Sequence, residues 1–209
     1  MENYNRTTLK NLAKEKIKGK VLNLFLAELV VLALTGAANG IPGLGQLVSI
    51  AMLVLTIGLS VFYLKFLDNG TMDYMDLFYS FSFKDLNKYL NHLATMLVKM
   101  LLIFLWSLLF IIPGIVKAIA YSQAEYIKAE NPDMDIMGTL KESERLMKGH
   151  KMEYFVLCLS FIGWWFLVVI TFFLAGIYVM PYYSTTKALF YRNLVPKIKI
   201  EAVDGSAVL

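Results

Sequence analysis

The sequence contains little of what builds a disulfide-linked, metal-binding or disordered protein. Its 209 residues include one cysteine, Cys158, and two histidines, His92 and His150. A single cysteine excludes an intramolecular disulfide framework, and two isolated histidines exclude a His-rich metal site. Charged residues make up only 17% of the chain and aromatic residues 14%, so the chain can bury enough apolar surface to offset its lost conformational entropy. This composition excludes a disordered protein.

The motifs of common enzymes are also missing. The sequence has no HExxH zinc motif, no GxSxG nucleophile motif, no Walker phosphate loop and no dinucleotide-binding glycine pattern. His150 lies close to Glu153, but at an expected membrane boundary, and Cys158 has no histidine beside it. We therefore expect a protein that is not an enzyme and uses no cofactor.

Apolar residues dominate what is present. They make up 58% of the chain, and the mean hydropathy is +0.59, which predicts an integral membrane protein because a soluble monomer cannot cover so much apolar surface. A helix crosses the hydrocarbon layer in roughly 20 residues. Runs of that length occupy residues 21–38, 44–67 and 93–112, and the long run 154–194 should reverse near Ala175 and Gly176 into spans 154–174 and 175–194.

A further span at residues 113–129 is predicted from charge, because hydropathy alone would reject a segment with Lys117, Glu125 and Lys128. Short Lys/Arg-rich segments are retained in the cytoplasm. If residues 113–129 cross the membrane, all basic segments lie on one side of it and three uncharged turns lie on the other. If they do not cross, the basic segments are divided between the two sides. The pattern predicts an all-α, polytopic membrane helix bundle with six transmembrane helices as three hairpins, and with both termini cytoplasmic.

The basic tail, residues 1–20, is predicted to form an amphipathic helix. Leu9, Leu12, Ala13 and Ile17 recur at helical spacing, which suits a helix on the anionic inner leaflet, and a solvated helix that only fixes topology is the alternative. The net charge of +4 has the same origin, so we expect no nucleic acid as a partner.

Two inner-face segments and a C-terminal tail, residues 195–209, complete the predicted organisation. Segment 68–92 is rich in aromatic residues and is expected at the headgroup zone, with a partner-docking surface as the alternative. Segment 130–153 should contain a short helix with Asp133 or Asp135 as its N-cap and Gly149 just past its end.

Four charged residues fall inside the predicted spans at a similar depth. Counted from the inner ends at 1.5 Å per residue, Glu28, Lys99, Glu125 and Lys187 lie roughly 6 to 11 Å below the cytoplasmic boundary. Charges within a membrane usually face a partner or a water-filled cavity. We therefore expect Glu125 or Glu28 to pair with Lys187 or Lys99.

Two tyrosines extend this layer along the helices. Tyr121 shares a helical face with Lys117, Glu125 and Lys128, and Tyr183 shares one with Lys187. The candidate intramembrane polar layer is thus Glu28, Lys99, Glu125, Lys187, Tyr121 and Tyr183. The layer either holds the helices together or lines a pathway for a ligand or ion. Lys117 itself is expected one turn below the outer face, within reach of headgroups.

Two functions fit these features. The first is a scaffold or accessory subunit that contacts the lipid bilayer and partner membrane proteins, or a second copy of the chain, through its inner-face segments. The second is a small transporter or exporter component that uses the charged layer as its binding site.

The chain also resembles a bacterial membrane-protein family known as domain of unknown function 975. The resemblance rests on an ordered set of short matches: Ile112-Pro113-Gly114, Tyr121-Ser122, Asn131-Pro132-Asp133, Ser143, Met147 to Lys151, Phe155, Leu159 to Trp164, Pro181-Tyr182 and Phe190-Tyr191, with Ala13-Lys14, Lys18-Gly19 and Leu77 to Phe81 nearer the N-terminus. It implies a multi-pass protein of the bacterial cytoplasmic (inner) membrane, distantly similar to membrane domains attached to some glycerophosphodiesterases. The resemblance implies no activity and no functional residues.

Overall fold

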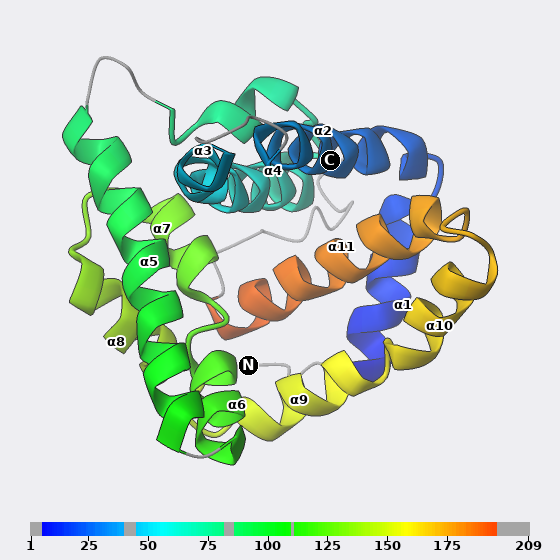
Figure 1. Cartoon of the computed structure of the whole chain (residues 1–209). Helices are drawn as coiled ribbons and strands as arrows, with labels where there is room; N and C mark the ends of the chain where they lie inside the picture. The colour runs from blue at the N-terminus through cyan, green and yellow to red at the C-terminus, as the bar shows by residue number, and fades with distance from the viewer. Residues whose placement is uncertain (1–5, 40–44, 82–85, 110, 196–209) are drawn as a thin grey trace, which may run out of the picture.

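The computed structural model describes residues 6–39, 45–81, 86–109 and 111–195, and every regular element within them is helical (Figure 1). The all-α prediction is therefore confirmed for these residues. The elements are α1 (Arg6–Ile17), α2 (Val21–Asn39), α3 (Gly45–Ala51), η1 (Met52–Val54), α4 (Leu55–Asn69), η2 (Tyr74–Phe78), α5 (Leu86–Leu109), α6 (Ile111–Ala120), α7 (Ala124–Glu130), α8 (Ile136–Leu146), α9 (Lys151–Leu159), α10 (Ile162–Ile170) and α11 (Gly176–Leu194).

Helix α11 occupies the middle of the molecule (Figure 1). It packs against α1, α2, α4 and α10. In the same view α2, α3 and α4 form one side, α5 to α8 a second, and α9 with α10 a third. The side chains that α11 buries include Tyr182, Phe190 and Tyr191, so the core around it is aromatic.

Three helical stretches are long and apolar enough to cross a membrane: Val48–Asn69, Leu86–Leu108 and Lys151–Ile170. A fourth would be Arg6–Ile17 with Val21–Ala37, if that pair, bent by 97°, is one span. Large apolar side chains also cover the outside, among them Leu108 at 74% exposure and Ile170 at 72%. An apolar exterior of this kind indicates a membrane protein.

The predicted spans agree with the helices in most places. The bounds of spans 21–38 and 175–194 coincide with those of α2 and α11, and span 44–67 coincides with the run from α3 to α4, but α11 is not among the described helices that are long and apolar enough to cross a membrane. Span 113–129 does not form one helix, because α6 and α7 are separated by a turn at residues 121–123. Residues 40–43 of the predicted turn 39–43 lie outside the described residues. Residues 1–5 of the basic tail and residues 196–209 of the C-terminal tail also lie outside them.

Lys117 has a partner that the sequence pattern did not predict. Its ammonium pairs with Glu144 of α8, Nζ to Oε1 at 2.8 Å. The break between α6 and α7 explains why α8 docks there, because it leaves backbone groups that need partners. Ser143 Oγ donates to the Ala120 carbonyl at 2.8 Å and accepts from the Gln123 N–H at 3.2 Å. Part of segment 130–153 thus lies beside the fourth predicted span.

The ends of α8 agree with the sequence pattern. The Asp135 side chain accepts a hydrogen bond from the Gly138 N–H at 3.0 Å and caps the N-terminus. Gly149 follows the C-terminus with φ +88°, a left-handed conformation that glycine adopts without strain. These two residues fix the length of the helix.

Helix α1 differs from the expected surface helix. Its apolar stripe, Leu9, Ala13 and Ile17, is buried in the protein, so the interpretation that this stripe lies on lipid was wrong. Lys10 Nζ donates to the carbonyl and to Oγ of Ser160 at 3.3 and 3.1 Å, and it lies 4.5 Å from the centre of the Phe161 ring. The aromatic core therefore offers α1 a partner that the sequence of the tail does not reveal.

Part of segment 68–92 is folded onto α4. A Cβ atom on Gly58 would lie 2.0 Å from the Leu77 carbonyl oxygen, so only glycine permits this close approach of η2. Lys65 and Asp76 form an ion pair at 2.6 Å across the same contact. This part of the segment is packed against α4, while Met75 and Phe78 remain exposed.

Candidate binding cavity

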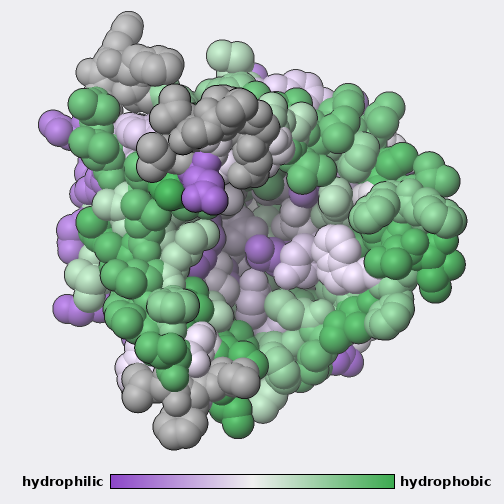
Figure 2. Space-filling model, viewed as in Figure 1, coloured by the Kyte–Doolittle hydropathy of each residue, from purple (hydrophilic) through white to green (hydrophobic). Residues whose placement is uncertain are grey.

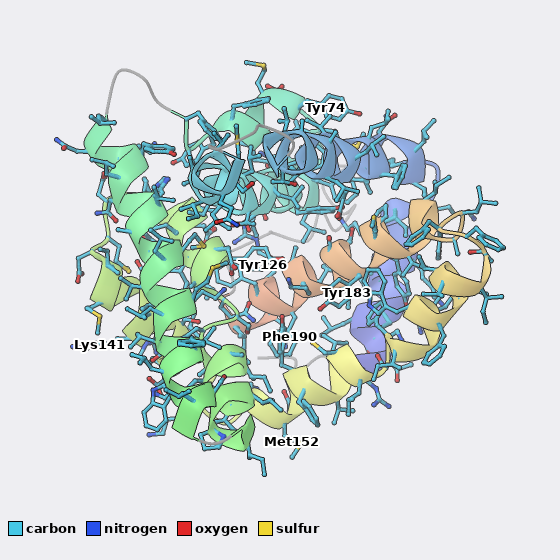
Figure 3. All side chains as sticks on the ribbon, in the orientation of Figure 1. Tyr74, Tyr126, Lys141, Met152, Tyr183 and Phe190 are labelled. Atoms are coloured by element: carbon cyan, nitrogen blue, oxygen red, sulfur yellow. The ribbon has the colours of Figure 1, made fainter. Side chains whose placement is uncertain are left out.

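A polar cavity of about 140 Å³ lies between α4, α7 and α11. Eight residues line it: Thr56, Leu59, Ser60 and Tyr63 of α4, Glu125 and Tyr126 of α7, and Ser184 and Lys187 of α11. In the same region, Figure 2 shows a hollowed face with hydrophilic residues deep inside and hydrophobic residues around it. Figure 3 places Tyr126 and Tyr183 near the centre of the molecule.

The wall formed by α4 follows from its sequence. Thr56, Ser60 and Tyr63 recur at helical spacing, so they share one face of an otherwise apolar helix. Thr56 Oγ1 donates to the Leu53 carbonyl at 2.7 Å, and Ser60 Oγ donates to the Thr56 carbonyl at 2.9 Å. Both hydroxyl hydrogens are therefore engaged by the backbone of η1 and α4, which leaves the oxygen lone pairs as acceptors.

Lys99 and Glu125 form an ion pair that joins α5 to α7. Lys99 Nζ lies 2.5 Å from Glu125 Oε1, and the two side chains are 14% and 22% exposed. The structure thus brings together two of the four charges in the predicted layer. Each charge satisfies the other where water is scarce, which a partly buried pair requires.

Glu28 reaches the cavity only indirectly. Its Oε1 accepts a hydrogen bond of 2.8 Å from the Tyr63 hydroxyl, and Glu28 itself is not among the lining residues. This contact connects α2 to α4 and consumes the phenol hydrogen.

Lys187 lines the cavity without an ionic partner. Among the described residues no carboxylate lies within ion-pair distance of its ammonium, and the nearest recorded contact is the Tyr183 ring, whose centre lies 5.4 Å away. Lys187 and Glu125 face the same space from α11 and α7, but Glu125 is held by Lys99. A cation thus faces a polar hollow inside an apolar molecule.

The two tyrosines of the predicted layer have different positions. Tyr183 lies beside Lys187, and its hydroxyl is 3.9 Å from Cys158 Sγ. Tyr121 lies outside the cavity, in the turn between α6 and α7, with its ring 5.4 Å from Lys117 Nζ. Tyr121 thus lies beside Lys117, as the sequence pattern predicted, but not among the residues that line the cavity.

An arginine-centred network closes one end of the same three helices. Arg192 of α11 donates to both oxygens of Asp68 at 2.8 and 2.6 Å and to Glu130 Oε1 at 2.6 Å. Tyr191 donates its hydroxyl to Glu130 Oε2 at 2.7 Å. Asp68, Glu130 and Arg192 follow the last lining residues of α4, α7 and α11 by four or five positions, which is about 6–8 Å along a helix.

Sequence reasoning missed this network and the uncharged lining residues. The polar spacing of Thr56, Ser60 and Tyr63 in an apolar helix is the signal that would have found the α4 wall. Within the part of the chain that the structure describes, no three His, Cys, Asp or Glu side chains are grouped as metal ligands. The chemistry available at the cavity is binding of a polar group.

The described residues are all helical, with an apolar exterior, three helices able to span a membrane and a cavity lined by polar side chains, and these are features of a membrane protein. Residues 111–197 match the family described as "Protein of unknown function (DUF975)", which confirms the family resemblance over that part of the chain. The matched part includes α7 and α11, two of the three walls of the cavity. No curated protein and no solved structure matches the chain.

Proposed function

We propose that the chain is a multi-pass integral protein of the bacterial cytoplasmic membrane that binds a small polar solute in the cavity between α4, α7 and α11. It serves as a component of a transport or export system and is not an enzyme. The observation that supports this proposal is the cavity itself, where Lys187 and Glu125 face one hollow in a molecule with an apolar exterior. Ionisable groups in such a position usually mark a ligand or ion pathway.

The arginine network supports a role in which the cavity opens to one side at a time. Arg192 joins the ends of all three wall helices, so solute can leave past these ends only when its ion pairs with Asp68 and Glu130 separate. The network is thus the gate that we propose at this end of the cavity.

The membrane topology that we propose is the six-span arrangement with three hairpins and both termini in the cytoplasm. Lys141 on the exposed face of α8 provides the test, because only this threading places segment 130–153 on the cytoplasmic side together with the basic tail. In a Cys158→Ala background, Lys141→Cys should stay unlabelled by an impermeant thiol reagent in intact cells and should react after lysis. Ala175→Cys, in the predicted outer turn, should react in intact cells. Labelling of Lys141→Cys before lysis would overturn the topology.

Entry of solute requires water in the cavity, and Ser184→Cys in the Cys158→Ala background tests this. Ser184 lines the cavity, and sulfur replaces its oxygen with little change in shape. We expect small water-soluble methanethiosulfonates to modify this thiol within minutes in membranes. Val169→Cys, on a residue that is 67% exposed on the apolar face of α10, should remain unmodified because lipid covers it. If Ser184→Cys is inert while Lys141→Cys reacts in the same lysed membranes, the binding function is wrong.

A scaffold role is the second candidate, and exposed side chains near η2 favour it. Met75 is 71% exposed, and Phe78 is 39% exposed. Apolar side chains at such positions suit contact with lipid, with a partner membrane protein or with a second copy of the chain. A scaffold would lose its function in Met75→Ser and Phe78→Ser, whereas a solute-binding protein would lose it in Lys187→Met.

A further inference from the structure

We infer that the cavity is an oxyanion site: Lys187 binds a phosphate or carboxylate group of a small molecule, and the α4 wall accepts hydrogen bonds from hydroxyl or amino groups of the same molecule. This inference rests on the proposed binding function and names the chemical class of the ligand.

The cation that lines the cavity favours an anion. Glu125 and Lys187 are its two charged lining residues, and Glu125 is in contact with Lys99 at 2.5 Å. Glu28 is in contact with the Tyr63 hydroxyl, so among the described residues neither acid lies within ion-pair distance of Lys187. The remaining ammonium presents N–H donors to the hollow, and an oxyanion is the group that satisfies both its charge and its hydrogens.

The hydroxyl groups of the wall define the other half of the ligand. The hydroxyl hydrogens of Thr56 and Ser60 are donated to backbone carbonyls. The Tyr63 hydroxyl hydrogen is donated to the Glu28 carboxylate. Toward the cavity the oxygens of Thr56 and Ser60 can act only as acceptors, and the Glu125 carboxylate is an acceptor as well, whereas the Tyr63 oxygen already accepts from the Ser184 hydroxyl. A ligand that carries donors beside its oxyanion pairs with these groups, whereas a bare anion leaves them unpaired.

The cavity also limits the size of the group that it holds. Its volume of about 140 Å³ is below the roughly 300–1,000 Å³ that is typical of sites for drug-sized ligands. A small phosphorylated or carboxylated solute fits this description, and so does the headgroup of a phospholipid that enters from the bilayer. Both sources share the same recognition chemistry.

Charge selectivity of thiol modification tests the oxyanion site. At Ser184→Cys in the Cys158→Ala background, we expect sulfonatoethyl methanethiosulfonate, an anion, to react faster than its trimethylammonium analogue of similar size. The ratio of the two rates should fall about tenfold or more in Lys187→Met, because a unit charge within several ångströms dominates the local potential. Any effect of Lys187 on the reactivity of the thiol itself cancels in this ratio. Lys187→Arg should preserve the ratio.

The matched control is Lys141→Met, which removes the same charge at an exposed position on α8 (Figure 3). It should leave the rate ratio unchanged. If Ser184→Cys reacts but shows no preference for the anion, or if Lys187→Met keeps the preference, the oxyanion site is wrong while the water-accessible binding cavity stands. If neither reagent reacts, the proposed function fails first.

Protection from modification then distinguishes the two sources of ligand. Ethanolamine phosphate combines a phosphate with an amino donor, so it should protect Ser184→Cys in lipid-stripped detergent micelles at lower concentration than inorganic phosphate if the ligand is a free solute. If the ligand is a headgroup, protection should require nanodiscs of phosphatidylethanolamine and should be weaker in phosphatidylcholine, which lacks N–H donors. Protection by none of these probes would contradict the inference.

Discussion

Arg192→Met is expected to lower the stability of the folded protein by about 3 kcal/mol, the lower end of the range for removing one partner of a buried ion pair. Arg192 is the cation for two carboxylates, those of Asp68 and Glu130, and the three side chains are only 12%, 20% and 18% exposed. Methionine fills similar volume but removes the cation that both acids contact. For a chain of this size the loss corresponds to a fall in the thermal unfolding midpoint of roughly 6–12 °C.

Arg145→Met is the matched control for this prediction. Arg145 also makes a two-bond contact with a carboxylate, to Glu142 at 2.7 and 2.6 Å, but within one turn of α8 and on the exposed surface. The Arg145 guanidinium holds the pKa of the Glu142 carboxyl below its usual value. Exposed pairs of this kind add little to stability, so the unfolding midpoint should hardly move. Equal midpoints for the two variants in detergent would contradict a helix-joining role for Arg192.

Partial rescue separates charge from shape. Arg192→Lys keeps the charge but loses the planar fork that reaches both acids, so its midpoint should lie between those of the wild type and Arg192→Met. Asp68→Asn combined with Arg192→Met should be more stable than Arg192→Met alone, because one of the two stranded charges is gone. The same variants should raise access to the cavity from the gated end, since the ion pairs that join the three helices are lost.

The sequence predicted those parts of the fold that depend on local patterns. Helix α8 begins at the N-cap Asp135 and ends before Gly149 because capping is decided within a few residues. The bounds of α2 were also predictable, since a continuous apolar run sets them, and the start of α11 follows the reversal expected near Ala175 and Gly176. The number of membrane spans stays a prediction. The distribution of charge along the chain predicts on which side of the membrane each segment lies, but it predicts no contact between helices.

The break in residues 113–129 depends on contacts between distant residues. Charge counting treated Glu144 and Ser143 as parts of an exposed loop, whereas the structure uses them to pair with Lys117 and with the open backbone at Ala120. A helix can break inside a protein only where another segment supplies such partners, and α8 does so from 20 or more residues away. No pattern within the span itself predicts this.

The sequence predicted which charged residues lie at a similar level along their helices, but it did not decide which lysine contacts Glu125. Counting residues from the inner boundary indicated that Glu125 and Lys187 lie at one level, and both line the same cavity. Which lysine contacts Glu125 depends on which helices are neighbours, and depth alone does not decide that. The network around Arg192 was missed for the same reason, because Asp68 lies 124 positions away in the sequence.

Lys99→Met is expected to remove the anion preference of the cavity as well as stability. Glu125 would lose the ammonium now 2.5 Å from its Oε1, and Lys187 on the facing wall would become its nearest counter-charge. Lys187 would then be neutralised by the protein itself and would no longer attract an oxyanion. We expect the free energy of unfolding to fall by about 2 kcal/mol. The loss is limited because the Lys99–Glu125 pair is partly exposed and because Lys187 replaces part of the attraction to Glu125. The rate ratio of anionic to cationic reagent at Ser184→Cys should fall about tenfold.

Glu125→Gln should act in the opposite direction on selectivity. It leaves Lys99 without its carboxylate and removes the negative charge that faces the cavity, so the cavity becomes more positive and the anionic reagent should gain further over the cationic one. Combining Lys99→Met with Glu125→Gln removes the pair as a neutral unit, which should return both the unfolding midpoint and the anion preference toward wild-type values. A double variant that shows no preference for the anion would mean that Lys99 contributes the attracting charge, and Lys187 would then not be the oxyanion-binding residue. Because Lys99 and Lys187 carry the same charge but only one has a partner, this comparison identifies the lysine available to the ligand.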